Sequence, residues 1–401
     1  MQLKASNVLI SDLFSTRTRC AICSFTSQQV KRVTTPVFSY VREFCHHVLE
    51  LLMKGFASAL SVGVVASGLF AGGCKDSGIE PSTSSPIQKY YLYVGNWGFD
   101  QVYVVDTDSN TVVDTLRGFG SVWDLATTVD GTKLYVCARM GGPNAPGSVY
   151  SVDIRRKVSK QIHPKVADVY VTPQGTVVII SRDPYQPMRP IGTIDPATDA
   201  ITFFDTLDIR DTGHNDQGVV FSRNKPLLYG INNGGQLFAY DYDSKETKKI
   251  YNNLNENLRM ALSPDGKLIF VSGGDIFDLE RDSTVGFVGG NKLGSVTLNP
   301  SGEYLYVTDP GGYLIDPIPS GKVFIFDTKT KSYSGYVDVK KSSPISYQTD
   351  RIVLTPDGKT AYVSNWLDRI FVIDLQASEV TKMILVPAGS QPVPMVLCAR
   401  P

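Results

Sequence analysis

The sequence predicts an all-β fold, a seven-bladed β-propeller of four-stranded blades, from a repeated phrase and from a match between the two ends of the repeat region. The phrase is a β-rich run, a Pro-Asp-Gly turn, then Tyr-Val and a polar residue. Its clearest copies begin at Leu262, Leu298 and Leu354, and looser copies begin at Thr127, Val171 and Phe221. Copies spaced by about 36 to 56 residues indicate one supersecondary unit stacked on itself.

Each copy continues into an alternating strand that ends in Asp, as at residues 102–106, 323–327 and 370–374. One turn later comes another short strand, as at residues 111–116. Four strands per unit is the size of a propeller blade. The fifth unit, residues 270–290, is less regular, because its third strand around residues 276–284 is blurred.

The ends of the repeat region complete each other. The first repeat starts at residues 90–94 with no strand before it, so it supplies only the outer three strands of a blade. The tail at residues 393–399 matches the run before each turn and is followed by no turn. Pairing this tail with the first repeat gives seven blades and leaves no sheet edge open.

These phrases resemble the YVTN-repeat β-propellers, the group that includes surface-layer-protein-like and YncE-like propellers. The motif PDGK-x-x-YVSN at residues 356–365 and the FVID at residues 371–374 carry the resemblance, which covers residues 90–401. It implies a binding or scaffold protein, because members of this group have diverse partners, and it implies no particular activity.

The front of the chain predicts export. Residues 1–52 are interpreted as an upstream extension of the gene prediction, disordered or non-native. Residues 53–73 have the basic start and short apolar core of a signal peptide. The run 71–74 resembles a bacterial lipobox with Leu69 displaced to five places before Cys74, which is expected to carry the lipid. The alternative is a plain secretory signal with a chance cysteine.

Residues 74–89 are expected to form a polar tether and residues 90–401 the propeller. Lys75 replaces the Asp that usually retains lipoproteins in the inner membrane, so we expect a lipid-anchored protein of the bacterial outer membrane, on its periplasmic side or at the cell surface. Balanced charge, with 39 basic and 39 acidic residues, disfavours nucleic-acid binding. Cys137 and Cys398 are expected to be packed free thiols of a monomer.

No catalytic motif is present, so we expect no enzyme, no cofactor and no metal site. The propeller region holds only His163 and His214, too few for metal ligation. The Asp residues that end the third strands are expected to accept backbone N–H bonds in the turns that follow. They are Asp106, Asp153, Asp195, Asp241, Asp327 and Asp374.

The two faces of the ring are predicted to differ. Turns between first and second strands, and between third and fourth, are tight and define a tight-turn face. The other connections define a loop-rich face, with long loops such as residues 139–147, 309–321 and 273–283. Long loops on a rigid scaffold are where binding residues concentrate.

All three tryptophans map to the loop-rich face. Trp97 and Trp366 follow an Asn in repeats that ring closure makes neighbours, and Trp123 enters an inner strand. They could stack on a flat or sugar-like ligand. The alternative is that they cap the blade interfaces, an interpretation that the sequence favours for Trp123.

A second set of candidate binding residues comes from aligning the inner strands on their turns. Seven positions before each turn glycine, at the expected channel mouth, stand Asp124, Asp168, Gly218, Arg259, Ser295 and Arg351. Asp and Arg side chains there are expected to leave the core for water and either to pair with one another or to orient a polar ligand over the channel.

Together these patterns predict a non-catalytic binding or scaffold lipoprotein that captures a small ligand or docks onto an outer-membrane partner such as a transporter. The resemblance to surface lipoprotein propellers implies nutrients such as corrinoids as one ligand class. Two alternatives stay open: a lyase or lactonase with its active site at the channel mouth, and a purely structural cell-surface protein.

Overall fold

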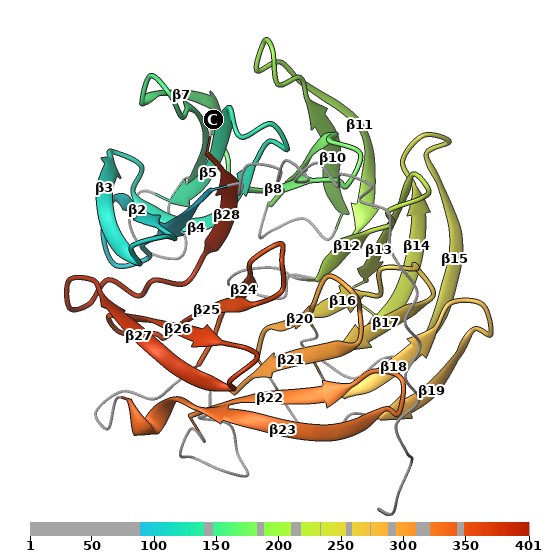
Figure 1. The fold of residues 1–401 in the computed structure, drawn as a ribbon. Coiled ribbons are helices and arrows are strands. Elements are labelled where there is room, and N and C mark those ends of the chain that lie inside the picture. The colour runs from blue at the N-terminus through green and yellow to red at the C-terminus, as the bar shows by residue number, and fades with distance from the viewer. Residues whose placement is uncertain are drawn as a thin grey trace, which may run out of the picture. The chain divides into compact units, whose positions relative to one another are not determined.

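The computed structural model describes residues 89–139, 147–182, 188–209, 218–232, 234–253, 259–272, 274–287, 294–309, 321–342 and 349–400. Within this part of the chain, seven four-stranded antiparallel sheets form a β-propeller (Figure 1). The predicted fold class is confirmed. The predicted signal peptide, Cys74, most of the tether and His214 lie outside the described residues.

In every sheet, or blade, the strands follow one order from the centre outward. The innermost strands are β28 (Met395–Ala399), β4 (Ser121–Thr127), β8 (Ala167–Val171), β12 (Val219–Phe221), β16 (Met260–Leu262), β20 (Val296–Leu298) and β24 (Ile352–Leu354). The second strands are β1 (Tyr90–Gly95), β5 (Lys133–Arg139), β9 (Val177–Ser181), β13 (Leu227–Ile231), β17 (Leu268–Val271), β21 (Tyr304–Thr308) and β25 (Thr360–Ser364).

The third strands are β2 (Gln101–Asp106), β6 (Gly147–Asp153), β10 (Met188–Ile194), β14 (Gln236–Asp241), β18 (Asp275–Asp278), β22 (Lys322–Asp327) and β26 (Arg369–Asp374). The outermost strands are β3 (Thr111–Arg117), β7 (Val158–His163), β11 (Ile201–Asp208), β15 (Glu246–Asn253), β19 (Ser283–Phe287), β23 (Ser332–Asp338) and β27 (Glu379–Leu385). A 3-10 turn, η1 (Val339–Lys341), follows β23. None of the described residues forms a helix that is long and apolar enough to cross a membrane. Blades are numbered here along the chain, blade 1 being the one that contains β1.

The ring closes as the sequence predicts. The last strand, β28, pairs antiparallel with β1, from Tyr90 opposite Ala399 to Val94 opposite Met395, and so supplies the inner strand of blade 1. In Figure 1 the dark red β28 lies inside the blue blade. Each blade therefore has all four strands.

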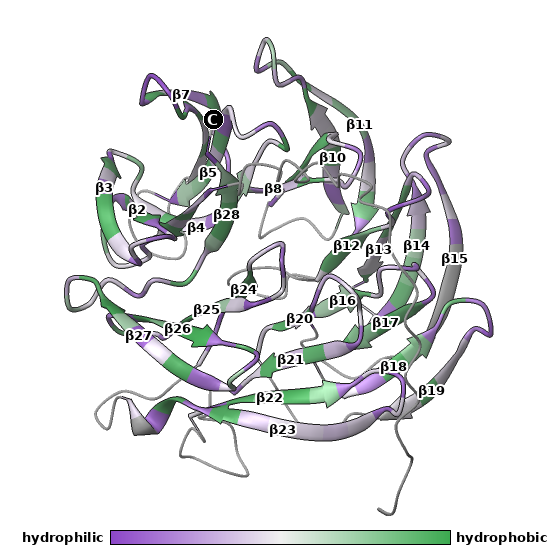
Figure 2. Cartoon of the chain, viewed as in Figure 1, coloured by the Kyte–Doolittle hydropathy of each residue, from purple (hydrophilic) through white to green (hydrophobic). Residues whose placement is uncertain are grey.

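The core lies between the blades. Buried apolar side chains of the described residues form seven clusters, each shared by two adjacent blades. The cluster between blades 7 and 1 joins Tyr362 and Ile370 to Leu92 and Met395. Figure 2 shows hydrophobic residues concentrated on the inner strands and more polar ones on outer strands such as β23. Every interface, including the closing one, is sealed by burial of apolar area.

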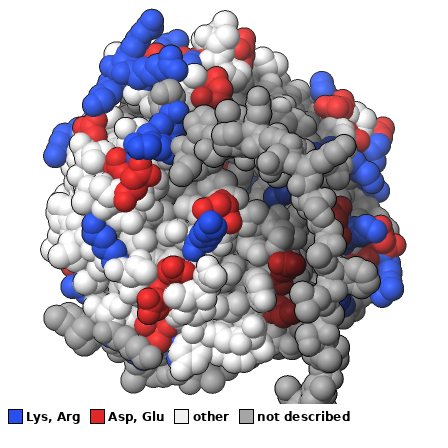
Figure 3. Space-filling model, in the orientation of Figure 1, with Lys and Arg blue, Asp and Glu red and all other residues white. Residues whose placement is uncertain are grey.

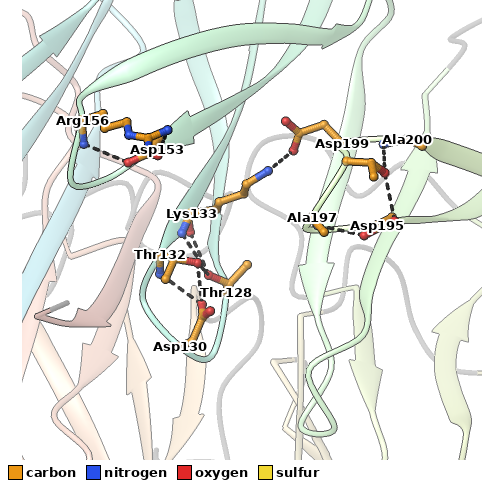
Figure 4. A network of polar contacts seen from close by, with 11 residues as sticks. Thr128, Asp130, Thr132, Lys133, Asp153, Arg156, Asp195, Ala197, Asp199 and Ala200 are labelled. Carbon is orange, nitrogen blue, oxygen red and sulfur yellow. Dashed lines mark hydrogen bonds and ion pairs between the residues drawn. The ribbon is translucent and has the colours of Figure 1, made fainter.

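The turns of the tight-turn face are built by two devices. In the inner turns, Gly302 has φ of +77°, and a Cβ there would lie 2.5 Å from Pro264 of the preceding blade, so only glycine fits. In the outer turns, the Asp side chain accepts N–H bonds from residues two or three places on, as Asp153 does from Arg156 (Figure 4). The fourth residue after each Asp has positive φ, as Lys157 has. The structural role predicted for these aspartates is confirmed.

The fifth blade corrects one predicted loop. Residues 275–287 form β18, a turn and β19, rather than the long loop expected at residues 273–283. Asp278 makes the same turn contacts as the six aspartates recognised from sequence. The loop prediction was wrong because β18 has only four residues, which is too short for an alternating pattern to show.

Candidate functional site

The three tryptophans form one continuous cluster on the loop-rich face. Trp97 lies between β1 and β2, Trp366 lies between β25 and β26, and Trp123 is in β4. The Trp97 ring centroid is 5.7 Å from that of Trp366, nearly edge to face, and 5.9 Å from that of Trp123. Trp123 is buried, whereas Trp97 and Trp366 are half-buried. The cluster joins blades 7, 1 and 2, and ring closure brings its members together.

Local hydrogen bonds fix the loops that carry Trp97 and Trp366. The Asn365 side-chain oxygen accepts N–H bonds from Leu367, Asp368 and Arg369, which folds the loop back on itself. The Asn96 oxygen accepts the N–H of Phe99 in the same way. The segment between β27 and β28 adds a further contact, because the Trp97 N–H donates to the Gln391 carbonyl at 3.3 Å. Asn96 and Asn365 are therefore structural, and the Trp after each of them is held in place.

A β-bulge sets the orientation of Trp123. Between β4 and β5, Val122 pairs with Ala138 and Asp124 pairs with Cys137, so Trp123 has no paired residue on β5. Bulges bend a strand locally and redirect a side chain. This extra residue explains how Trp123 joins the cluster from an inner strand.

Two arginines that the sequence analysis missed border the aromatic cluster. The Arg139 guanidinium carbon lies 4.1 Å from the centre of the Trp123 ring, and that of Arg182 lies 5.9 Å from it. Such distances allow a cation–π attraction. An alignment of the repeats could have found these arginines, because Arg139 occupies the position of Trp366 and Arg182 occupies that of Asn365. Blade 2 thus places a cation where blades 7 and 1 place an aromatic ring.

Of the residues predicted at the channel mouth, Arg259 is half-buried and the others are buried. The exposed fraction is 9% for Asp124, 5% for Asp168 and 8% for Arg351, and Ser295 is fully buried. The expectation that these side chains leave the core for water was wrong. The innermost strands of neighbouring blades lie close together, as β4 and β8 do, and side chains that point into so narrow a space cover one another.

Two members of this set form ion pairs with residues outside it. Asp168 is bridged to Arg182, with its Oδ2 2.5 Å from the Arg182 Nε. The Arg259 guanidinium lies 3.0 Å from a carboxylate oxygen of Asp350. Both partners lie outside the predicted set, although Asp350 directly precedes Arg351. Aligning one strand position across the blades could not find partners that come from other positions of the repeat.

Asp124 has the most perturbed electrostatics of this group. Burial, followed by repulsion from Asp168, raises the pKa of the Asp124 carboxyl to about 7, while Arg351 and the Leu125 N–H act in the opposite direction. Burial and the neighbouring Arg259 lower the pKa of Arg351. One buried carboxyl thus changes its charge near neutral pH beside the aromatic cluster.

The arrangement suits binding of a flat ligand with a polar or anionic edge. The half-buried indole rings of Trp97 and Trp366 offer area for stacking. Arg139 and Arg182 add positive charge beside the Trp123 ring, but both are buried and Arg182 is paired with Asp168. Among the described residues, no cluster of His, Cys, Asp and Glu could hold a metal ion. The two cysteines described, Cys137 and Cys398, are buried free thiols, as predicted.

Comparison with solved structures shows the same fold. The chain is similar to the hydrazine synthase of Kuenenia stuttgartiensis, with TM-score 0.55 and 20% identity over 71% of this chain and 92% of that one. It is similar to a protein from Bacteroides fragilis assigned provisionally as a 6-phosphogluconolactonase, with TM-score 0.56 and 17% identity over 79% and 99%. A functionally unknown protein from Desulfotomaculum acetoxidans has TM-score 0.58 and 13% identity over 78% and 99%.

Identities this low show the shared β-propeller fold alone. No protein-family model matches the sequence. No curated protein matches it either.

Proposed function

We propose that this protein is a non-catalytic binding propeller that captures a small ligand at the tryptophan cluster of its loop-rich face. The observation that carries the proposal is the cluster itself: Trp97 and Trp366 are half-buried, and Trp123 connects them to Arg139. Aromatic faces give large contact area at low entropic cost, and a nearby cation adds orientation. The ligand class is a flat molecule with a polar or anionic edge.

The cellular setting completes the proposal. The lipobox-like run that ends at Cys74 supports a lipid anchor in the bacterial outer membrane, and the repeat phrases support membership of the YVTN-repeat propellers. A tethered binding domain of this kind would concentrate its ligand near an outer-membrane transporter. Corrinoids, which combine a flat macrocycle with polar edges, fit the chemistry of the cluster and are the first ligands to test.

The test uses residues 84–401, which form one compact unit and contain all seven interblade clusters and the closing strand. The chain has three tryptophans, and all of them belong to the cluster. Tryptophan fluorescence therefore reports on this site alone. We expect cyanocobalamin to bind in calorimetric titration. We also expect the colourless nucleotide part of cobalamin, dimethylbenzimidazole ribotide, to quench the emission.

Variants separate binding from support of the fold. Trp97→Ala should weaken binding by roughly 1 to 3 kcal/mol, as expected for a stacked aromatic contact, with little change in melting temperature. Tyr333→Ala, an exposed aromatic residue on the outer strand β23, is the matched control and should leave affinity unchanged. Unchanged affinity of the Trp97 variant for a ligand that does bind would refute the assignment of the site. If neither probe binds, the corrinoid class is excluded.

A second candidate function rests on Asp124. A buried carboxyl with a pKa of about 7 can act as general acid or base at neutral pH. It would make the channel a lactonase site, the activity assigned provisionally to the Bacteroides fragilis structure. Turnover of 6-phosphogluconolactone that is lost in Asp124→Asn would favour this function over non-catalytic binding.

A further inference from the structure

The chain enters the propeller on the tight-turn face. Lys89 directly precedes β1, and its Nζ lies 3.0 Å from Asp108 in the outer turn of blade 1. The Tyr90 carbonyl accepts bonds from Thr107 in that turn. Any tether that links the ring to Cys74 therefore leaves from this face, on the side away from the tryptophan cluster. About fifteen residues separate Cys74 from Lys89, a reach of at most about 50 Å.

An exposed basic surface lies on the next blade. The outer turn of blade 2 and the start of β7 carry Arg155, Arg156, Lys157 and Lys160, all exposed, and we call these four residues the blade-2 basic edge. Figure 3 shows this blue group over β7. No acidic residue occurs between Asp153 and Asp168. The equivalent segment of blade 4, by contrast, intersperses its lysines with Asp243 and Glu246.

Nearby acids neutralise only part of this charge. Lys157 Nζ lies 2.5 Å from Asp114 of blade 1, and Arg156 lies 3.9 Å from Asp153. The Lys157 contact joins the basic edge to the blade at which the chain enters the ring. Since the side chain of Arg156 stays 81% exposed, its charge is available to a partner outside the protein.

We propose that the blade-2 basic edge binds the anionic headgroups of the membrane that carries the anchor. Exposed cations next to the exit of a lipid tether lie where headgroup phosphates are concentrated, and each Lys or Arg near an anionic surface raises partition about fivefold. Binding there turns the tight-turn face toward the membrane and the tryptophan cluster away from it. The inference rests on the lipid anchor of the proposed function and extends it to the orientation of the ring.

The test again uses residues 84–401, which lack the anchor, so that vesicle binding reports on the surface alone. Vesicles of phosphatidylethanolamine and phosphatidylglycerol at 3:1 should sediment the protein at low salt and release it at high salt, and phosphatidylcholine vesicles should not bind it. The triple variant Arg155→Glu, Arg156→Glu, Lys160→Glu should lower the partition coefficient at least tenfold.

A matched control separates the basic edge from net charge. The triple variant Lys225→Glu, Lys329→Glu, Lys359→Glu makes the same change in net charge at exposed positions dispersed over the same face. Its partition coefficient should change less than threefold, and equal losses in both variants would overturn the proposal. Binding to polyglutamate without binding to anionic vesicles would overturn it in favour of an acidic protein partner.

Ligand affinity at the tryptophan cluster is measured on the same variants. Intact ligand binding without vesicle binding refutes only the orientation. Vesicle binding without ligand binding refutes only the capture function.

Discussion

Replacing Asp124 by Asn should stabilise the protein above neutral pH and leave its stability at pH 4 nearly unchanged. The folded state raises the pKa of this carboxyl from 3.8 to about 7, so folding favours its protonated form. The contribution of this carboxyl to the free energy of unfolding is fully present below pH 4 and is lost as the pH rises through 7. The reason is that the charged form, which predominates at higher pH, is unfavourable in the buried site. Asn is neutral and similar in shape, and it avoids that loss.

The size of the effect follows from the shift. About three pKa units correspond to a ceiling of about 4 kcal/mol. The charges that face Asp124 reduce the gain, since Asn loses the attraction to Arg351 and Arg182 as well as the repulsion from Asp168. Cys137 and Tyr170, whose pKa values burial raises, stay neutral over this range. We expect a net gain of about 1 to 3 kcal/mol at pH 8.

The assay is urea denaturation of the wild type and the variant from pH 4 to pH 8.5, followed by tryptophan fluorescence. Asp327→Asn is the control of opposite sign, because backbone N–H donation from Thr330 lowers the pKa of Asp327. That variant should lose stability above pH 4. A gain for Asp124→Asn that is equal at pH 4 and pH 8.5, or no gain at pH 8.5, would show that the carboxyl does not titrate as argued.

Three further predictions concern the anchor and the ring. Cys74→Ala in the full chain should abolish lipid labelling and release the protein from membranes, while removal of residues 1–52 should change neither; normal membrane retention of the Cys74 variant would contradict the anchor. Deleting residues 393–401 removes β28 and exposes the edge of β1, so the chain should lose several kcal/mol of stability or aggregate, and an unchanged melting temperature would count against closure by this strand. The half-buried ion pair between Lys133 of blade 2 and Asp199 of blade 3 (Figure 4) should show a coupling free energy of about 1 kcal/mol in a double-mutant cycle, measured by denaturation. If the two substitutions change the free energy of unfolding additively, the pair does not stabilise the contact between the blades.

The fold was readable from the sequence because it is a sum of local repeats. Each turn glycine, each strand-ending Asp and each alternating run is specified within a few residues, and the six copies of the repeated phrase reinforce one another. Ring closure was readable for the same reason, since the tail matches the inner strands that it joins. Only blade 5 was misread, where β18 is too short for its alternation to be seen.

The sequence by itself determined the seven blades, the two unlike faces and the neighbourhood of Trp97 and Trp366. Tertiary structure alone decided that Trp123 joins them, because a bulge in β4 is needed to turn its side chain. It also decided the ion pairs, which unite Asp168 with Arg182 and Arg259 with Asp350. A repeat specifies the geometry of its own backbone locally. The partner of a buried charge depends instead on which side chains from several blades come into contact near the centre of the ring, and the sequence of one repeat does not contain that information.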